Sequence, residues 1–168
     1  KPTNNLLYIN FQIFLFLSFS NESIAAASIA QVHRAKTRDG QDVIVKVQRP
    51  DIADQIRADL SVLHYFARML EAVIEEMGVY TPTAIVEEFD RAVHEELDFL
   101  QEAANVRAFF QNHADRTTVK IPKVYDDLTA RTVLTLEYIE APKLSSAALD
   151  DEGRQRLATI LVEDAFKQ

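Results

Sequence analysis

Two strand-like runs separated by a short turn limit the possible folds of this chain more than any other part of its sequence. The runs are Ile29–Thr37 and Asp42–Gln48, and Asp39-Gly40 lies between them. Asp-Gly is a strong signal for a hairpin turn, because tight turns need positive φ angles that these residues tolerate. Pro50 follows the second run and cannot donate to a sheet. We therefore expect an antiparallel hairpin that ends before residue 50.

Three helices are expected after this hairpin. Residues 51–77 carry apolar side chains at spacings of three and four, which predicts a long amphipathic helix, and Gly78 is suited to end it. A second helix is expected to start with Thr81 as its cap and run to about Glu95. A third is expected from Asp98 to about Asn112, because an acidic cap followed three residues later by glutamine is typical of a helix start.

The remainder of the chain is predicted to return to strands. Val119–Tyr125 and Thr132–Ile139 are strand-like, and a last helix is expected over Leu149–Gln168. The order strands, helices, strands, helix predicts an α+β fold in which a small antiparallel sheet packs against helices.

The first 18 residues have no clear place in this fold. Leu6–Phe19 is mainly apolar but too short to cross a membrane, for which about 20 residues are needed. Two interpretations stay open: the hydrophobic part of a signal peptide cleaved near Ala25–Ala27, or the edge of a buried strand or helix. We favour the second, leave residues 1–18 unassigned, place one domain over 19–168, and expect Lys1 to about Phe16 to pack irregularly.

Composition excludes some classes of function. The 168-residue chain has a formal net charge of −8, which argues against nucleic acid as a partner, because phosphate contacts need clustered Lys and Arg. It contains no cysteine and therefore neither disulfides nor thiolate metal sites. The four histidines lack a second ligand at metal-binding spacing, so we assign them no catalytic or metal role.

Three features bear on chemistry. Lys46 lies inside an otherwise apolar strand, where it is either an edge lysine reaching water or a charge with a buried partner. The run Glu95–Glu102 is either a solvated acidic helix start or the source of that partner, in particular Glu102. The loop Ala25–Ser28 is either a packing contact or a small-residue loop whose backbone approaches phosphates. Each is weak alone, but their order is that of a protein-kinase N-lobe, with residues 134–139 at the position of the hinge.

Three segments together resemble the UbiB family, the aarF-domain (ADCK-like) atypical kinases linked to ubiquinone biosynthesis: Ala25–Ala35, Val45–Pro50 and Glu95–Asn105. The resemblance covers roughly Phe19–Gln168. It implies a protein-kinase-like N-lobe in which the long helices before Glu102 are an insertion. It also implies that the C-lobe, the catalytic loop and the main metal ligands lie beyond Gln168, so that the chain alone is inactive. The family's KxGQ motif is absent from this sequence.

The resemblance implies a role for each candidate site residue. An alanine-rich loop, the phosphate-contacting lysine with its helix partner, and the hinge would contact the nucleotide: Ala25, Ala26, Ala27, Ser28, Lys46, Glu102, Glu137, Tyr138 and Ile139. Glu96 and Asp98 would form the family's ExD motif beside the nucleotide. The implied cofactor is ATP or ADP with Mg²⁺.

The same resemblance implies that this chain is the ATP-binding part of an atypical kinase or ATPase that acts in ubiquinone (isoprenoid-quinone) biosynthesis. The implied location is the cytoplasm, peripheral to or anchored at a membrane, with quinone-biosynthesis enzymes or membrane lipid as partners. A non-catalytic nucleotide- or lipid-sensing pseudokinase scaffold is the alternative. A small-molecule kinase of the aminoglycoside or choline type is disfavoured, because such N-lobes lack the paired-helix insertion and the ExD run.

Overall fold

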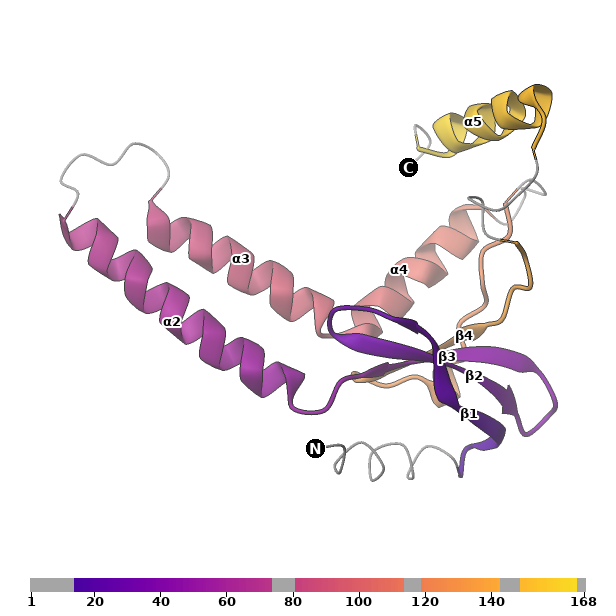
Figure 1. Cartoon of the computed structure of the whole chain (residues 1–168), viewed down its shortest axis with the longest axis horizontal. Helices are drawn as coiled ribbons and strands as arrows, with labels where there is room; N and C mark the ends of the chain where they lie inside the picture. The colour runs from indigo at the N-terminus through magenta and orange to yellow at the C-terminus, as the bar shows by residue number, and fades with distance from the viewer. Residues whose placement is uncertain (1–13, 74–80, 114–118, 143–148, 166–168) are drawn as a thin grey trace.

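The fold is a four-stranded sheet combined with four helices and one short 3-10 turn in the described part of the chain (Figure 1). The computed structural model describes residues 14–73, 81–113, 119–142 and 149–165. The elements, in order, are β1 (Phe16–Ala26), β2 (Ala30–Thr37), β3 (Asp42–Gln48), α2 (Ile52–Val73), α3 (Pro82–Glu96), α4 (Phe99–Asn112), η1 (Asp126–Leu128), β4 (Val133–Glu137) and α5 (Asp151–Ala165).

The sheet is antiparallel throughout, in the order β1-β2-β3-β4. The predicted hairpin is confirmed: β2 and β3 pair in continuous register from Ala30↔Gln48 to Lys36↔Asp42. Gly40 has a φ of 88° in the turn between them, where a side chain would strain the backbone. The predicted α+β class, with a small antiparallel sheet packed against helices, is therefore correct.

Two strand assignments differ from the sequence prediction. The edge of a buried strand or helix was favoured for Leu6–Phe19, but no strand was predicted over Phe16–Ala26, because the polar stretch after Phe19 hides the pattern of β1. The predicted strand Val119–Tyr125 is wrong, because within it only Val124 forms a bridge, to Leu136. The proposed division between residues 18 and 19 falls within β1, and residues 1–13 lie outside the described part of the chain.

The two faces of the sheet carry separate apolar cores. On one face Phe16 packs with Ala35, Val43, Val45 and Val133. On the other, Phe99 and Ala103 of α4 pack with Ala30, Val124 and Leu134. Residues alternate between faces along a strand, so this second face is the one that also presents Lys46.

The predicted helices are present, with the expected caps on α3 and α4. The Thr81 hydroxyl accepts a hydrogen bond from the N–H of Ala84, and Pro82 is the first residue of α3. The Asp98 carboxylate accepts from the N–H of Leu100 at the start of α4. α2 is described to Val73, so its predicted end at residue 77 and Gly78 lie outside the described residues, as do residues 166–168 after α5.

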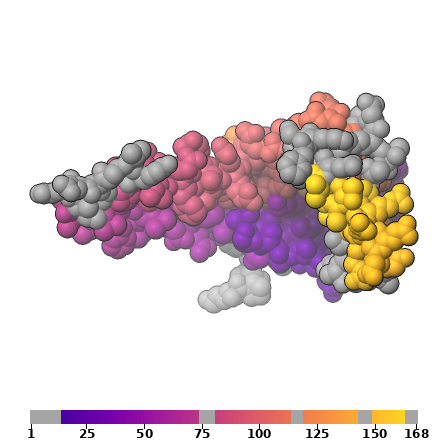
Figure 2. All heavy atoms as spheres, turned by 90° about the horizontal axis from the view of Figure 1, so that it is seen from above, coloured from indigo at the N-terminus to yellow at the C-terminus, as the bar shows by residue number. Residues whose placement is uncertain are grey.

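α2 and α3 form an antiparallel arm that extends away from the sheet, and α5 lies at the opposite end of the molecule (Figures 1 and 2). His64 on α2 and Asp90 on α3 fasten the arm, with Nε2 and Oδ2 2.8 Å apart. No helix in the described ranges combines the length and apolarity needed to cross a membrane.

Candidate functional site

Lys46 is centred in the sheet rather than placed at an edge. It lies opposite Val32 on β2 and Leu134 on β4. Its side chain is 19% exposed, so the ammonium requires a partner to offset its lost hydration. The interpretation of Lys46 as an edge lysine reaching water is therefore wrong.

That partner is Glu102, as the order of motifs predicted. Lys46 Nζ lies 2.6 Å from Glu102 Oε2, joining β3 to the first turn of α4. The Nζ also lies 4.7 Å from the centroid of the Phe99 ring, whose face attracts a cation. Because Phe99 is fully buried and anchors α4 to the sheet, the apolar core sets the position of the ion pair.

The ion pair opens into a pocket of about 440 Å³. Lys46, Glu96, Glu102 and Asn105 are among the residues that line it. Glu96 is the last residue of α3 and is exposed, so its carboxylate can approach a ligand in this pocket. Such a pocket suits an anionic ligand with a bound metal cation, because Lys46 can contact the anionic group and the acidic side chains can contact the metal.

The two acidic residues of the proposed ExD motif have different surroundings. Asp98 is not among the residues lining this pocket. Its carboxylate caps α4 through the N–H of Leu100 and lies 3.4 Å from Nε of Arg131. In this structure Asp98 therefore helps to fix the start of α4, which carries Glu102.

The alanine-rich segment forms the tip of the β1–β2 hairpin. Ala25 and Ala26 end β1, and Ala27 and Ser28 form the turn; all four are exposed. The Arg49 guanidinium donates to the carbonyl of Ala27, which ties the turn to the end of β3. Small side chains on this tip leave its backbone accessible, as an approach to phosphates requires.

The expected hinge begins where β4 ends. Glu137 is the last residue of β4, and the N–H of Tyr138 donates to the carbonyl of Asp42 at 3.1 Å. The Glu137 carboxylate lies 2.5 Å from Lys120 Nζ, and the hydrogen bond from Lys120 holds the pKa of that carboxyl below its ordinary value. Glu137 therefore fastens the segment before η1 to β4, a role that sequence reasoning missed.

The face of the sheet between Lys46 and the hinge carries a short apolar strip. Register places Val32 beside Lys46, and Ile44 and Leu136 side by side one step further along. All three apolar side chains are half-buried. The strip therefore begins beside Lys46 and extends about 7 Å along the strands, since each strand residue advances about 3.3 Å.

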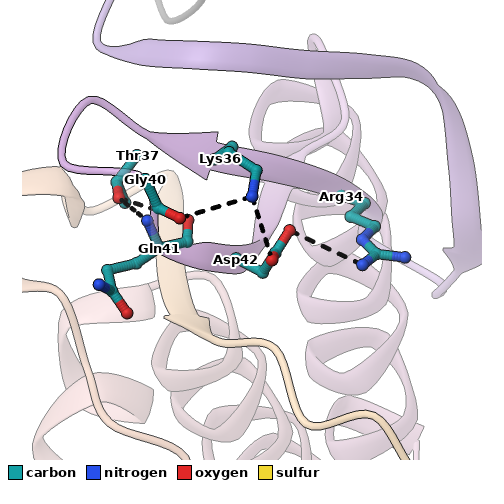
Figure 3. Close-up of polar contacts among 6 residues, drawn as sticks. All are labelled: Arg34, Lys36, Thr37, Gly40, Gln41 and Asp42. Atoms are coloured by element: carbon teal, nitrogen blue, oxygen red, sulfur yellow. Dashed lines mark hydrogen bonds and ion pairs between the residues drawn. The ribbon is translucent and has the colours of Figure 1, made fainter.

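Beyond the strip, a charged cluster closes the face. Figure 3 shows Asp42 between Arg34 and Lys36. The Asp42 carboxylate lies 3.7 Å from Arg34 Nη2 and 3.3 Å from Lys36 Nζ. The Arg34 guanidinium also lies over the Tyr138 ring, 4.3 Å from its centroid. No sequence signal pointed to Arg34, because its contact with Tyr138 joins two segments that are distant in the chain and separated by β3 in the sheet.

The described residues can supply only part of a metal site. No group of three or more His, Asp or Glu side chains in the described ranges is placed to hold a metal ion. Mg²⁺ commonly takes one or two carboxylates and completes its shell with substrate phosphates and water. Glu96, at the pocket, fits such a single contribution.

The chain resembles known proteins over most of its length. The family described as "ABC1 atypical kinase-like domain" matches residues 12–168. The chloroplastic protein ACTIVITY OF BC1 COMPLEX KINASE 8 of Arabidopsis thaliana is 39% identical over 92% of this chain. The probable protein kinase UbiB of Azotobacter vinelandii is 37% identical over 82% of this chain.

A solved structure agrees with these sequence matches. Rv3197 of Mycobacterium tuberculosis, determined in complex with erythromycin, superposes with a TM-score of 0.70 at 33% identity over 79% of this chain. This chain spans 33% of that protein, 21% of the Arabidopsis protein and 26% of the Azotobacter protein.

Proposed function

Because the chain belongs to the ABC1 atypical kinase-like family, we propose that it binds the phosphates of ATP or ADP through Lys46. The observation that carries this proposal is the 2.6 Å ion pair between Lys46 and Glu102, which opens into a pocket on the same face as the apolar strip. Glu102 holds the flexible lysine in one orientation before a ligand arrives, which lowers the entropy lost on binding.

The proposed division of labour follows the geometry. Lys46 donates to phosphate oxygens, while the exposed alanine tip supplies backbone N–H groups. The base lies along Ile44 and Leu136 towards the hinge residues Glu137, Tyr138 and Ile139. Glu96 and Asp98 act as the ExD pair, with Glu96 at the pocket and Asp98 fixing the start of α4. Mg²⁺ bound with the nucleotide would neutralise phosphate charge, with Glu96 as one ligand.

The whole protein is proposed to be a kinase or ATPase of isoprenoid-quinone biosynthesis. Support for this comes from the similarity to the probable protein kinase UbiB of Azotobacter vinelandii, although this chain spans only 26% of that protein. Quinone-biosynthesis enzymes or membrane lipid are the proposed partners, and the cytoplasmic side of a membrane is the proposed location. The 168-residue chain is proposed to be inactive by itself, because phosphoryl transfer also requires a base and metal ligands.

Nucleotide binding is tested by NMR titration of the isotope-labelled chain with ATP, a method that detects even millimolar affinity. We expect shifts of the Lys46, Ile44 and Glu102 amides to saturate. Lys46→Ala should weaken binding roughly 10- to 100-fold, since a hydrogen bond to a charged group contributes about 1.5–3 kcal/mol. Lys36→Ala is the matched control, because Lys36 carries the same charge on the same sheet face but pairs with Asp42. Equal binding by wild type and Lys46→Ala would refute the proposal.

The alternative of a non-catalytic nucleotide- or lipid-sensing scaffold predicts the same binding. It differs in turnover by the full-length protein, which a phosphotransferase or ATPase would show and a scaffold would not. A comparison of the full-length protein with its own Lys46→Ala variant therefore separates the two functions.

A further inference from the structure

The contact between Arg34 and Tyr138 crosses the sheet face that presents Lys46. Arg34 belongs to β2 and Tyr138 follows β4, with β3 between them in the sheet. Their side chains nevertheless contact each other, with the Arg34 guanidinium carbon 4.3 Å from the centroid of the Tyr138 ring. The two side chains therefore reach towards each other over β3 and bound the apolar strip at its hinge end.

Asp42 holds both partners of this contact. Its carboxylate lies 3.7 Å from Arg34 Nη2, and its main-chain carbonyl accepts from the N–H of Tyr138 at 3.1 Å. Figure 3 shows the Asp42 carboxylate between Arg34 and Lys36. Because Arg34 and Asp42 are both nearly half exposed, the guanidinium can shift towards a ligand without breaking a buried contact.

The position of Arg34 relative to Lys46 suits the two ends of a nucleotide. Arg34 lies opposite Ile44, which is two residues before Lys46 on β3. Two strand residues span about 7 Å. A ribose separates base from phosphate by a comparable length. A phosphate at Lys46 thus puts a base over Ile44 and Leu136, in the cross-strand row that also contains Arg34. A planar cation is well suited to contact the π system of such a base.

We propose that Arg34 is a base-contacting residue of this site, positioned by Asp42 and Tyr138. This inference rests on the proposed nucleotide binding and adds to it the group that recognises the base end. The ligand class is a nucleotide, with ATP as the probe, and the Arg34 contact contributes to affinity for the base but not for the phosphates.

The test compares two probes, ATP and inorganic tripolyphosphate, on the wild-type chain and its variants by NMR titration. Arg34→Ala should weaken ATP binding roughly threefold to tenfold while leaving tripolyphosphate affinity unchanged, since cation–π contacts of this kind are modest. Arg34→Lys keeps the charge but loses the planar group, so it should also weaken ATP binding. Arg57→Ala, which removes an exposed cation on α2 that pairs with Asp54, should change neither affinity.

Each outcome bears on one of the two claims. If Arg34→Ala binds ATP as tightly as wild type, or loses affinity for both probes in equal proportion, the base contact is refuted while Lys46-dependent binding stands. If Lys46→Ala has no effect on either probe, the nucleotide site itself is refuted. If the spectrum of Arg34→Ala lacks the dispersion of a folded chain, Arg34→Lys provides the test instead, because its aliphatic side chain preserves the packing beside Ile44.

Discussion

Replacing Phe99 with alanine should destabilise this protein more than any exposed substitution on the same helix. Phe99 is 0% exposed and packs with Ala103, Val124 and Leu134. Removal of a buried phenyl ring combines lost transfer free energy with a residual cavity, for a total of about 3–5 kcal/mol. The change also removes the ring beneath the Lys46 ammonium, 4.7 Å away.

Phe110 provides the matched control, because it lies on the same helix with 50% of its surface exposed. Phe110→Ala should reduce the free energy of unfolding by at most about 1 kcal/mol, since little area is removed from water and no cavity forms. The assay is urea unfolding followed by circular dichroism. With a slope near 2 kcal/mol per M, Phe99→Ala should lower the midpoint by roughly 1.5–2.5 M.

A second variant keeps the prediction testable if Phe99→Ala does not fold. Phe99→Leu retains part of the volume and should lower the free energy of unfolding by about 1–2 kcal/mol. Equal losses for Phe99→Ala and Phe110→Ala, or no loss for Phe99→Leu, would contradict the assignment of Phe99 as the anchor between α4 and the sheet.

Three further predictions concern the turn, the arm and activity. Gly40 has a φ of 88°, so Gly40→Ala should lower the free energy of unfolding by about 1–2 kcal/mol in the same urea assay, and a neutral result would contradict the strained-turn argument. The hydrogen bond from His64 holds the pKa of Asp90 below its ordinary value of 3.8. The Asp90 carboxylate therefore stabilises the folded state above pH 3.8, and this contribution is lost as the pH falls through the lowered pKa. Asp90→Asn should therefore flatten the acid limb of the urea midpoint plotted from pH 3 to 7, whereas the exposed Asp59→Asn should not; identical limbs would count against it. The purified chain should hydrolyse radiolabelled ATP no faster than its Lys46→Ala variant, and turnover that this substitution abolishes would overturn the expectation of an inactive chain.

Local patterns determined the parts of the fold that depend on neighbouring residues. The Asp39-Gly40 turn, the amphipathic period of α2 and the caps Thr81 and Asp98 each involve residues a few positions apart. Such contacts form between chain neighbours, so their residue types predict them directly.

Pairings between distant segments were predicted less evenly. The order of the motifs led to Lys46 and Glu102, which the structure joins at 2.6 Å. A strand over all of Phe16–Ala26 was missed because most of its residues are exposed and its middle, Ser20–Ser23, is polar, so its strand character comes from pairing with β2 rather than from its own periodicity. Val119–Tyr125 is strand-like in sequence, yet only Val124 bridges to the sheet.

The sequence by itself therefore determined the hairpin, the helices and the identity of the cation and carboxylate at the site. Only the tertiary structure decided what surrounds them: Phe99 beneath Lys46, Glu137 fastening Lys120, and Arg34 reaching Tyr138 across β3. The physical reason is that strand order and register place side chains from separate segments on one face. That arrangement depends on how the whole sheet packs against α4, and the residue pattern of a single segment does not predict this packing.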